Sequence, residues 1–401
     1  MSIPIESIAD AAMADCILPT DIMLSILTRL PAKSIQRCKF VSKLWCELFC
    51  NPMFIKMYKG QFSLDPNNQS AIIFDIRERV MSLINIDSND SPKKPSNLFI
   101  PLSDRPGHMF LIGCCNGMIC MIHHVEDIVY LWNPAMEMYS SIELSEVGGR
   151  YIYDNRDDIL CDTHRRVSYV DGEEYFVSLG LGYDDEEDDF LLVRIVGLFV
   201  YGYLTTSFDL AEVYSLNSNA WITVGADFSF GVEKGSVVTV NGNPYWVAHT
   251  NDVEAERGDE EDALVYFDVK LLAFKIMSLP PPYLWSMHTS FVDLNGTLGY
   301  LECAPNIGNT DSCAKVWVFE DSWICKHTIG PINRTFDFDS YVMSFVLCSR
   351  NENILGCYND KCFVYDRQSN CVEDILTLEK HIRFKICGYT PNFEPRMLTA
   401  R

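Results

Sequence analysis

The residue types that could do chemistry are numerous in this sequence, but they are scattered. There are sixteen cysteines and eight histidines, and no nucleophile elbow or phosphate-binding loop accompanies them. A zinc site needs two closely spaced ligand pairs, and no second pair matches any of the closest ones, Cys46/Cys50, Cys114/Cys115 and Cys357/Cys362. We therefore expect a non-catalytic protein with no metal and no cofactor. The enzyme alternative is an oxidoreductase or glycosidase whose acids or ligands converge from separate repeats.

The cysteines and the N-terminal residues together bear on where the protein acts. Residues Met1 to Asp15 contain three acidic residues, no basic leader and no sustained apolar core, which argues against a secretory signal. We therefore expect the protein in the cytoplasm, the nucleus or both. Most cysteines are then expected to be reduced thiols that pack as small hydrophobic side chains.

The charge of the chain limits its partners. With 32 Lys and Arg against 55 Asp and Glu, the formal net charge is −23, which repels nucleic acid and anionic membrane surfaces. The charge-poor stretch from Gly107 to Val125 contains Asn116-Gly117, which indicates two strands and a turn rather than a membrane span. Two acidic runs, Asp184 to Asp189 and Glu254 to Asp262, are predicted to be solvated hairpin tips, with a docking site for a basic target as the alternative.

From Leu18 to about Tyr58 the spacing of apolar residues is helical. Ile22, Ile26 and Leu30 follow one another at steps of four, and Pro31 ends this first helix. A second short helix leads to Ser42, a predicted N-cap for the next one. Asn51-Pro52 ends that helix and starts a last one.

This helical region has about 40 residues and no metal or disulfide, and a core of that size rarely folds alone. Met23 and Leu27 add apolar surface beside the Ile22/Ile26/Leu30 row, which favours a unit that completes its core on another protein. The residues alone leave a second interpretation open. The helices could instead form an N-terminal cap on the domain that follows.

A motif that spans the whole helical region distinguishes the two interpretations. The matching segments are Leu18-Pro19-Thr20-Asp21, Ile26 to Ser34, Arg37, Lys39, Val41-Ser42-Lys43, Trp45 and Asn51-Pro52-Met53-Phe54. They resemble the F-box of the large plant F-box families, in which the helices dock on a Skp-type adaptor that leads to a cullin scaffold. By this resemblance the candidates for docking or for the core of the motif are Leu18, Pro19, Ile22, Ile26, Leu30, Pro31, Val41 and Trp45. Cys38 and Phe40 depart from the motif, because the family often has an aromatic residue at the first position and a cysteine at the second.

Beyond Gly60 the pattern changes to short apolar runs bounded by turn residues, which is typical of strands. An aromatic residue followed one hairpin later by a large apolar residue recurs six times. The pairs are Phe74/Met81, Trp132/Tyr139, Tyr214/Trp221, Phe267/Phe274, Trp317/Trp323 and Tyr365/Val372. The later pairs recur at about 50 residues, the length of a kelch-like propeller blade.

Asn-Gly turns at Asn116-Gly117, Asn241-Gly242 and Asn295-Gly296 supply further hairpins, so each repeat contains about four strands. We expect a mainly β protein: a small N-terminal helical F-box followed by a β-propeller-like domain of about six to eight blades. The segment Arg383 to Ile386 is predicted to pair with the first blade and close the ring. A β-sandwich array is the alternative.

The repeat region also resembles a known family, the F-box-associated interaction domain of plants. The matching residues are Gly113 to Cys120, Leu131 to Pro134, Leu181 to Asp184, Asp189 to Ile195, Glu212 to Leu216 and Asn219 to Trp221. Members of that family bind proteins destined for ubiquitination, among them pollen self-incompatibility receptors and regulators of immune receptors. The motifs do not identify the branch or the target.

Together the two resemblances imply the substrate-recognition subunit of a Skp-cullin-F-box ubiquitin ligase. The alternative is a propeller scaffold that acts outside a ligase. The domains expected are a flexible N-terminus over 1–15, an F-box over 16–59, the propeller-like domain over 60–392 and a flexible tail over 393–401. Target specificity is predicted to lie in loops away from the F-box, with Gly148 to Glu174 and Asn251 to Asp262 as the largest candidates.

Overall fold

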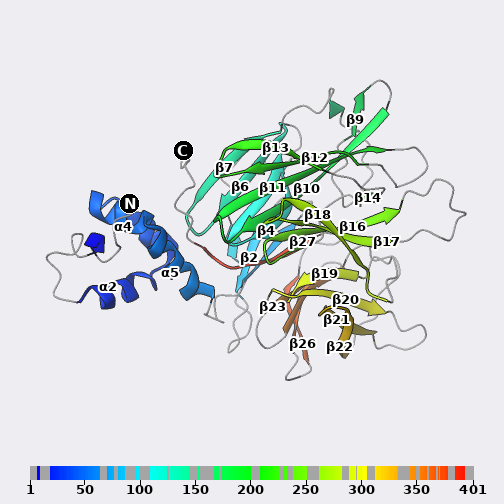
Figure 1. The fold of residues 1–401 in the computed structure, drawn as a ribbon. Coiled ribbons are helices and arrows are strands. Elements are labelled where there is room, and N and C mark those ends of the chain that lie inside the picture. Colours follow the sequence, from blue (N-terminus) through cyan, green and yellow to red (C-terminus); the bar gives the residue numbers. More distant parts are fainter. Residues whose placement is uncertain are drawn as a thin grey trace, which may run out of the picture.

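The fold consists of a small group of helices beside a ring of six antiparallel sheets (Figure 1). This computed structural model describes residues 7–9, 19–63, 70–75, 80–85, 96–98, 109–123, 126–144, 151–152, 167–170, 173–199, 208–225, 230–232, 238–250, 262–281, 289–294, 296–304, 312–332, 343–348, 353–358, 361–366, 369, 371–377 and 384–392. No helix among these residues is long and apolar enough to cross a membrane. Within the same ranges, no cluster of three or more His, Cys, Asp or Glu side chains could hold a metal ion.

We use the term helical unit for residues 19–63. Its helices are α2 (Thr20–Leu27), α3 (Ala32–Cys38), α4 (Lys43–Cys50) and α5 (Pro52–Ser63). The predicted N-cap is confirmed, since the Ser42 Oγ accepts a hydrogen bond of 3.2 Å from the Trp45 N–H. Asn51 separates α4 from α5, and α5 continues beyond the predicted end at Tyr58.

Six sheets follow along the chain, and we call them blades 1 to 6. Blade 1 contains β27 (Phe384–Tyr389), β1 (Ser70–Asp75), β2 (Met81–Asn85) and β3 (Ser96–Leu98). Blade 2 contains β4 (Met109–Cys115), β5 (Met118–His123), β6 (Ile128–Asn133) and β7 (Met138–Glu143). Blade 3 contains β8 (Tyr151–Ile152), β9 (Val167–Val170), β10 (Glu173–Asp184), β11 (Asp189–Phe199), β12 (Phe208–Ser215) and β13 (Ala220–Val224). Blade 4 contains β14 (Phe230–Val232), β15 (Val238–Val240), β16 (Asn243–Thr250), β17 (Asp262–Asp268) and β18 (Ala273–Ser278). Blade 5 contains β19 (Thr289–Asp293), β20 (Leu298–Ala304), β21 (Ser312–Phe319) and β22 (Trp323–Ile332). Blade 6 contains β23 (Met343–Cys348), β24 (Asn353–Tyr358), β25 (Lys361–Asp366) and β26 (Cys371–Thr377).

The innermost strands of the blades form a closed ring, which makes the domain a six-bladed propeller. β27 packs beside β4, β4 beside β10, β10 beside β15 and β16, β15 beside β19, β19 beside β23, and β23 beside β27. The C-terminal strand β27 pairs with β1 of the first blade, from Ser70 opposite Tyr389 to Asp75 opposite Phe384. The predicted closure is confirmed, and six blades fall within the predicted range. The β-sandwich alternative is wrong.

Five of the six aromatic pairs predicted from the sequence are direct cross-strand partners. They are Phe74/Met81, Trp132/Tyr139, Tyr214/Trp221, Phe267/Phe274 and Tyr365/Val372. The sixth pair also lies on the two strands of one hairpin but is not directly opposed, because Trp323 lies opposite Phe319 and Trp317 lies opposite Cys325. The β21–β22 turn is shorter than the turns of the hairpins that carry the other five pairs, and a register irregularity follows between Val316 and Trp317.

The Asn-Gly turns lie where the sequence predicts them. Asn116-Gly117 joins β4 to β5 and Asn241-Gly242 joins β15 to β16, with positive φ at all four residues. Asn295 is outside the described residues, but Gly296 also has a positive φ, of 88°. At Gly242 the requirement for glycine is strict, since an added Cβ would lie 1.9 Å from the Tyr183 carbonyl oxygen of blade 3.

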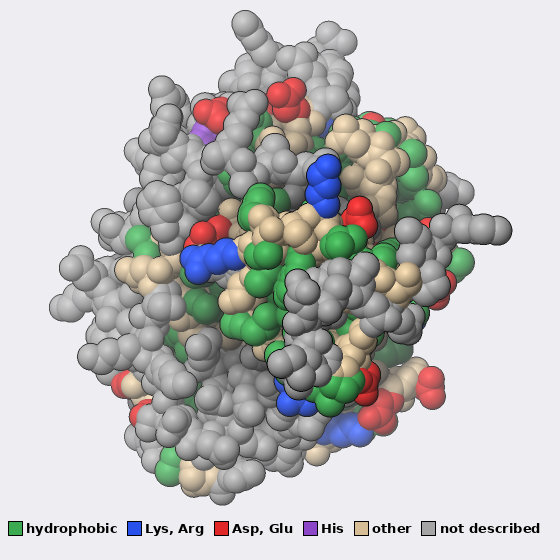
Figure 2. Space-filling model, turned by 90° about the vertical axis from the view of Figure 1, so that its left-hand side faces the viewer, with side chains coloured by type: hydrophobic (Ala, Val, Ile, Leu, Met, Phe, Trp, Pro, Cys, Tyr) green, Lys and Arg blue, Asp and Glu red, His purple; other side chains and the backbone are tan. Residues whose placement is uncertain are grey.

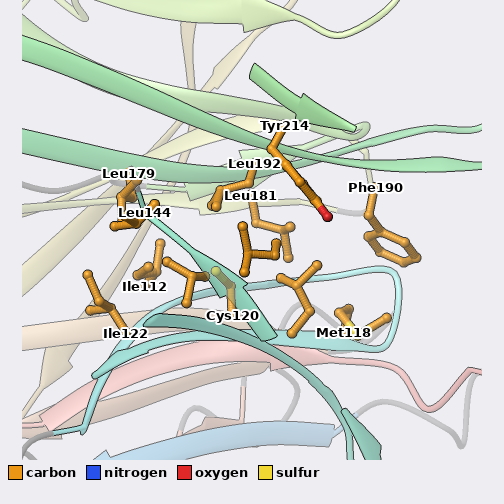
Figure 3. Packing of buried hydrophobic residues seen from close by; sticks show 13 residues of the cluster. Ile112, Met118, Cys120, Ile122, Leu144, Leu179, Leu181, Phe190, Leu192 and Tyr214 are labelled. Carbon is orange, nitrogen blue, oxygen red and sulfur yellow. The ribbon is translucent and has the colours of Figure 1, made fainter. Parts of the chain in front are cut away.

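Hydrophobic clusters fill the spaces between successive blades. Figure 3 shows the cluster between blades 2 and 3, where Met118, Cys120 and Ile122 of β5 face Leu179, Leu181 and Leu192 of β10 and β11. Similar clusters join blades 1 and 2, blades 3 and 4, and blades 4 and 5. Blades 2, 3 and 4 therefore bury both of their faces by stacking on their neighbours.

The cysteines differ from the expectation of reduced core thiols in two ways. Cys114 of β4 and Cys387 of β27 form a disulfide, which crosslinks the closing strand to the second blade. Four free cysteines, Cys46, Cys50, Cys325 and Cys371, are exposed rather than buried. Local spacing could not reveal the disulfide, because its cysteines are 273 residues apart in the sequence.

Candidate adaptor-binding surface

The helix α2 has one buried face and one exposed apolar face. Leu24 and Leu27 are buried in the core of the helical unit, and Met23 packs against them. Ile22 and Ile26, one turn apart, are each 45% exposed. Apolar residues on two faces of this helix were predicted, and the structure shows which face is covered: Met23 and Leu27 belong to the core, and Ile22 and Ile26 point outward.

The corner between α3 and α4 exposes a second group of apolar side chains. Phe40 is 86% exposed and Val41 is 69% exposed, just before the Ser42 cap. Leu44, in the first turn of α4, is also exposed, as are Met53 and Met57 of α5. Figure 2 views the molecule from the side on which the helices lie, and hydrophobic side chains are visible between polar and undescribed regions. Exposed large apolar groups of this kind indicate a protein-binding surface.

A ladder of aromatic rings lies beneath this surface. Trp45 contacts Phe49, Phe49 contacts Phe54, and Phe54 contacts Tyr58, with ring centroids 5.4, 5.0 and 6.4 Å apart. The Tyr58 hydroxyl donates a hydrogen bond of 2.9 Å to the Leu30 carbonyl oxygen. Burial raises the pKa of Tyr58 well above its ordinary value, so the phenol stays a neutral donor. The ladder thus holds α4 and α5 against the end of α2.

The residues predicted for docking or for the motif core therefore occupy two environments. Pro19, Ile22, Ile26, Pro31 and Val41 are exposed. Leu30 and Trp45 are partly buried and pack against the core of the unit. Leu18 lies outside the described residues. All eight remain candidates for adaptor contact, but the geometry favours the five exposed ones for direct contact and gives Leu30 and Trp45 a supporting place.

Sequence reasoning missed Phe40 as a candidate contact. The one available signal was the apparent exchange of Cys38 and Phe40 relative to the F-box motif. In the structure Cys38 packs against the core while Phe40 extends into solvent. Leu44, Met53 and Met57 were also missed, because a helical period does not show which of two apolar faces is covered.

The charge of the helical unit is opposite to that of the whole chain. Residues 19–63 contain seven Lys and Arg against Asp21 and Glu47, a net charge of +5 in a chain of −23. Arg29, Arg37 and Lys43 are exposed. An acidic partner is therefore favoured at the apolar surface of the helices.

The acidic run from Asp184 to Asp189 is the tip of the β10–β11 hairpin, as predicted, and its middle residues Asp185 to Glu187 are exposed, but its two ends are not. Asp184 and Asp189 are buried and cap turns, with Asp184 accepting from the Glu186 N–H at 2.9 Å and Asp189 from the Asn217 N–H at 2.9 Å. Asp188 pairs with Lys59 of α5 at 2.5 Å. Asp185 and Glu186 are exposed, but both contact Lys270 of blade 4. Groups from the chain itself therefore occupy much of this run.

The two predicted target loops are described only in part. Within Gly148 to Glu174 the structure describes the short strands β8 and β9, which extend blade 3 beyond β10. β9 lies at the far side of the propeller from the helices (Figure 1). In the segment Asn251 to Asp262, residues 251–261 lie outside the described ranges. The prediction that these loops select the target stays a prediction.

Comparison with known proteins assigns both the helical unit and the propeller to known domain families. The family model of the F-box domain matches residues 16–57, and that of the F-box associated β-propeller domain matches residues 69–393. This chain belongs to the F-box proteins with an associated β-propeller domain. F-box protein At3g23260 of Arabidopsis thaliana is 22% identical over 373 residues, which cover 90% of this chain and 91% of that protein. F-box protein CPR1 of the same plant is 25% identical over 374 residues, covering 88% of this chain and 82% of that protein.

A third relative bears on the repeat pattern. F-box/kelch-repeat protein At3g23880 of Arabidopsis thaliana is 23% identical over 246 residues, which cover 58% of each protein. The family membership supports, in general terms, a substrate-adaptor role in ubiquitin ligases for this F-box protein. Such families are typically non-catalytic receptors, and an F-box implies a Skp-type adaptor and a protein target as partners.

Proposed function

We propose that this F-box protein is the target-recognition subunit of a Skp-cullin-F-box ubiquitin ligase. The observation that carries the proposal is the exposed apolar surface of the helices, Ile22, Ile26, Phe40 and Val41, on a unit whose core is filled by other residues. This surface would dock on the Skp-type adaptor, and the adaptor would connect the chain to a cullin and a ubiquitin-conjugating enzyme. Ubiquitin chemistry would then occur on the conjugating enzyme, so the receptor needs no catalytic group.

The exposed residues are large enough to support such docking. Fully burying an isoleucine contributes roughly 1.5–3 kcal/mol, so covering the exposed half of Ile22 or Ile26 would contribute about 1 kcal/mol each. Phe40 is almost fully exposed and would contribute more than either isoleucine. Because the surrounding charge is positive, an acidic adaptor would also associate faster at low salt.

The propeller would capture the protein to be ubiquitinated. Its strands are committed to packing between blades, so recognition must rely on loops and blade edges. On the side of the helices, turns of blades 2 and 3 contact the helical unit itself. The opposite end is therefore the proposed target face, with loops 148–174 and 251–262 as candidates. We further propose that the protein acts in the cytoplasm, the nucleus or both, away from nucleic acid and membranes.

The test is binding of a purified Skp-type adaptor to the full chain. The double variant Ile22→Asp/Ile26→Asp places two charges in the proposed interface and is expected to weaken adaptor binding by about 100-fold or more. Ile324→Asp is the matched control, since Ile324 of β22 is 43% exposed and lies on blade 5. Co-purification with a cullin then distinguishes a ligase receptor from a scaffold that acts outside a ligase. Unchanged adaptor binding by the double variant would remove α2 from the interface.

A further inference from the structure

A turn of the propeller is built into the core of the helical unit. Met136, in the β6–β7 turn, is only 1% exposed and belongs to the same cluster as Leu27, Phe49 and Phe54. Hydrogen bonds of Asn133 hold this turn in place. Asn133 accepts a hydrogen bond from the Met136 N–H at 3.2 Å and donates one of 2.9 Å to the Asn392 carbonyl oxygen, just beyond the closing strand.

A second contact connects the helical unit to the neighbouring blade. The Lys59 ammonium of α5 donates to Asp188 at 2.5 Å and to the Tyr183 hydroxyl at 3.0 Å, and it lies 5.2 Å from the centre of the Tyr183 ring. The Tyr183 hydroxyl also donates to Asp188. Lys59 is 17% exposed in this environment, so solvent screens the ion pair less than it would on an open surface.

The β10–β11 hairpin that carries Asp188 is held from its other side as well. Lys270 of the β17–β18 turn contacts Asp185 at 2.9 Å and Glu186 at 2.7 Å. The Tyr183 N–H donates to the Gly242 carbonyl oxygen of blade 4 at 2.9 Å. The hairpin is therefore a fixed support rather than a loose acidic loop.

We propose that these contacts form a two-point joint that sets one orientation of the adaptor-binding helices relative to the propeller. A single contact would leave the helical unit free to rotate about it, whereas contacts on two neighbouring blades oppose both rotation and tilt. Met136, Lys59 and Asp188 are positioning residues in this scheme. The consequence for ubiquitination rests on the proposed function: a fixed orientation decides which lysines come within reach of the conjugating enzyme.

The experiment measures a distance in the full chain, so it does not depend on ligase activity. Spin labels are introduced as non-natural amino acids at two exposed positions, Glu47 of α4 and Glu373 of β26, and the distance distribution is recorded by pulsed electron resonance. We compare the parent chain with Lys59→Glu, which turns the ion pair with Asp188 into a repulsion. Lys56→Glu, an identical charge change at an exposed position of the same helix, is the control.

The joint predicts a single narrow distribution for the parent chain and for Lys56→Glu. Lys59→Glu is expected to broaden it by about twofold or to add a second peak, because the population shifts to other orientations. Adding Asp188→Asn, which keeps a residue that tolerates positive φ, should narrow the distribution again by removing the repulsion. Equal widths in all four proteins, or no narrowing in the double variant, would overturn the proposal.

A second measurement tests the consequence for ubiquitination. In a ligase reconstituted with a Skp-type adaptor and a cullin, mass spectrometry maps the lysines modified on the receptor itself. A changed pattern in Lys59→Glu at unchanged adaptor affinity supports orientation as the cause, and an unchanged pattern contradicts it. If the parent chain does not bind a Skp-type adaptor, the proposed function is refuted, but the measured spin-label distances still test the two-point joint.

Discussion

The shared core predicts that a mutation in the propeller weakens the helices. Met136→Ala removes a buried side chain that the β6–β7 turn contributes to the helical core. Truncating a buried methionine to alanine costs about 2–5 kcal/mol, and the cost is lowest where the surroundings can move into the space. Since the space lies between two units that can shift, we expect about 2 kcal/mol.

This loss should appear as local opening of the helices. A destabilisation of about 2 kcal/mol corresponds to roughly a 30-fold increase in the open population of α4 and α5. Hydrogen exchange with mass spectrometry on the full chain can follow peptides that cover residues 43–63 and residues 173–199 separately. Exchange in α4 and α5 should become about 30-fold faster, while exchange in β10 and β11 should stay slow.

The matched control is Met118→Ala, at a fully buried methionine between blades 2 and 3. It creates the same loss of atoms within the propeller, so it should weaken β5 and β10 without a selective effect on the helices. If Met136→Ala leaves the exchange of α4 and α5 at parent values, the helices hold their core without the propeller. Equal acceleration everywhere would also contradict the reasoning, because it would indicate general unfolding.

Three further predictions test other parts of the structure. Gly242→Ala should lower the melting temperature strongly, since positive φ alone costs about 1–2 kcal/mol and the added Cβ collides with the Tyr183 carbonyl; Gly60→Ala, which has open space, should have little effect. Trp45→Ala should destabilise the helical unit by about 2 kcal/mol, which is less than the roughly 3–5 kcal/mol of a fully buried ring, because Trp45 is only partly buried. The same variant should weaken adaptor binding, and Trp45→Phe should restore most of the stability and most of the adaptor affinity. Full adaptor binding by Trp45→Ala would exclude a supporting role for Trp45. Burial, with a smaller effect of the Asp293 charge, raises the pKa of the Cys115 thiol to about 12. Above the unfolded thiol pKa of about 8.5, the unfolded state therefore loses a proton that the folded state keeps. The free energy of unfolding should then fall as the pH rises above about 8.5. Iodoacetamide at about pH 8.5 should then modify the exposed Cys46 faster than the partly buried Cys115, and equal labelling rates would refute the raised pKa of Cys115.

Much of the propeller could be predicted because its signals are local. Cross-strand pairs such as Trp132/Tyr139 are joined by one short turn, so spacing alone gives the register. Asn116-Gly117 and Asn241-Gly242 likewise mark turns through their own backbone preferences. Trp317 and Trp323 are not directly opposed, because the spacing across a hairpin depends on turn length, which the residue types there do not specify.

The interactions between units could not be predicted, because they join residues that are distant in the sequence. Nothing in the β6–β7 turn distinguishes Met136 from an ordinary turn residue, and nothing near Asp188 indicates Lys59 as its partner. Both faces of α2 are apolar, so the period of the helix could not decide between Leu24 and Ile26 as the buried one. The F-box motif identified the candidate docking residues, whereas only the structure shows which of them are exposed.

The shared core reconciles the two interpretations that the size and apolar spacing of the helical region, without the motif, left open. A unit of this size lacks a sufficient core, and the propeller supplies part of the missing contact through Met136, with Ala135 and Met138 beside it. The helices are therefore a cap on the following domain on one side and an apolar binding surface on the other. Because Leu24, Phe49 and Phe54 are already buried within the chain, an adaptor has to cover the exposed apolar side chains, among them Ile22 and Phe40, and not the core. Binding can then be reversible, since releasing the adaptor exposes a surface without unfolding the helices that carry it.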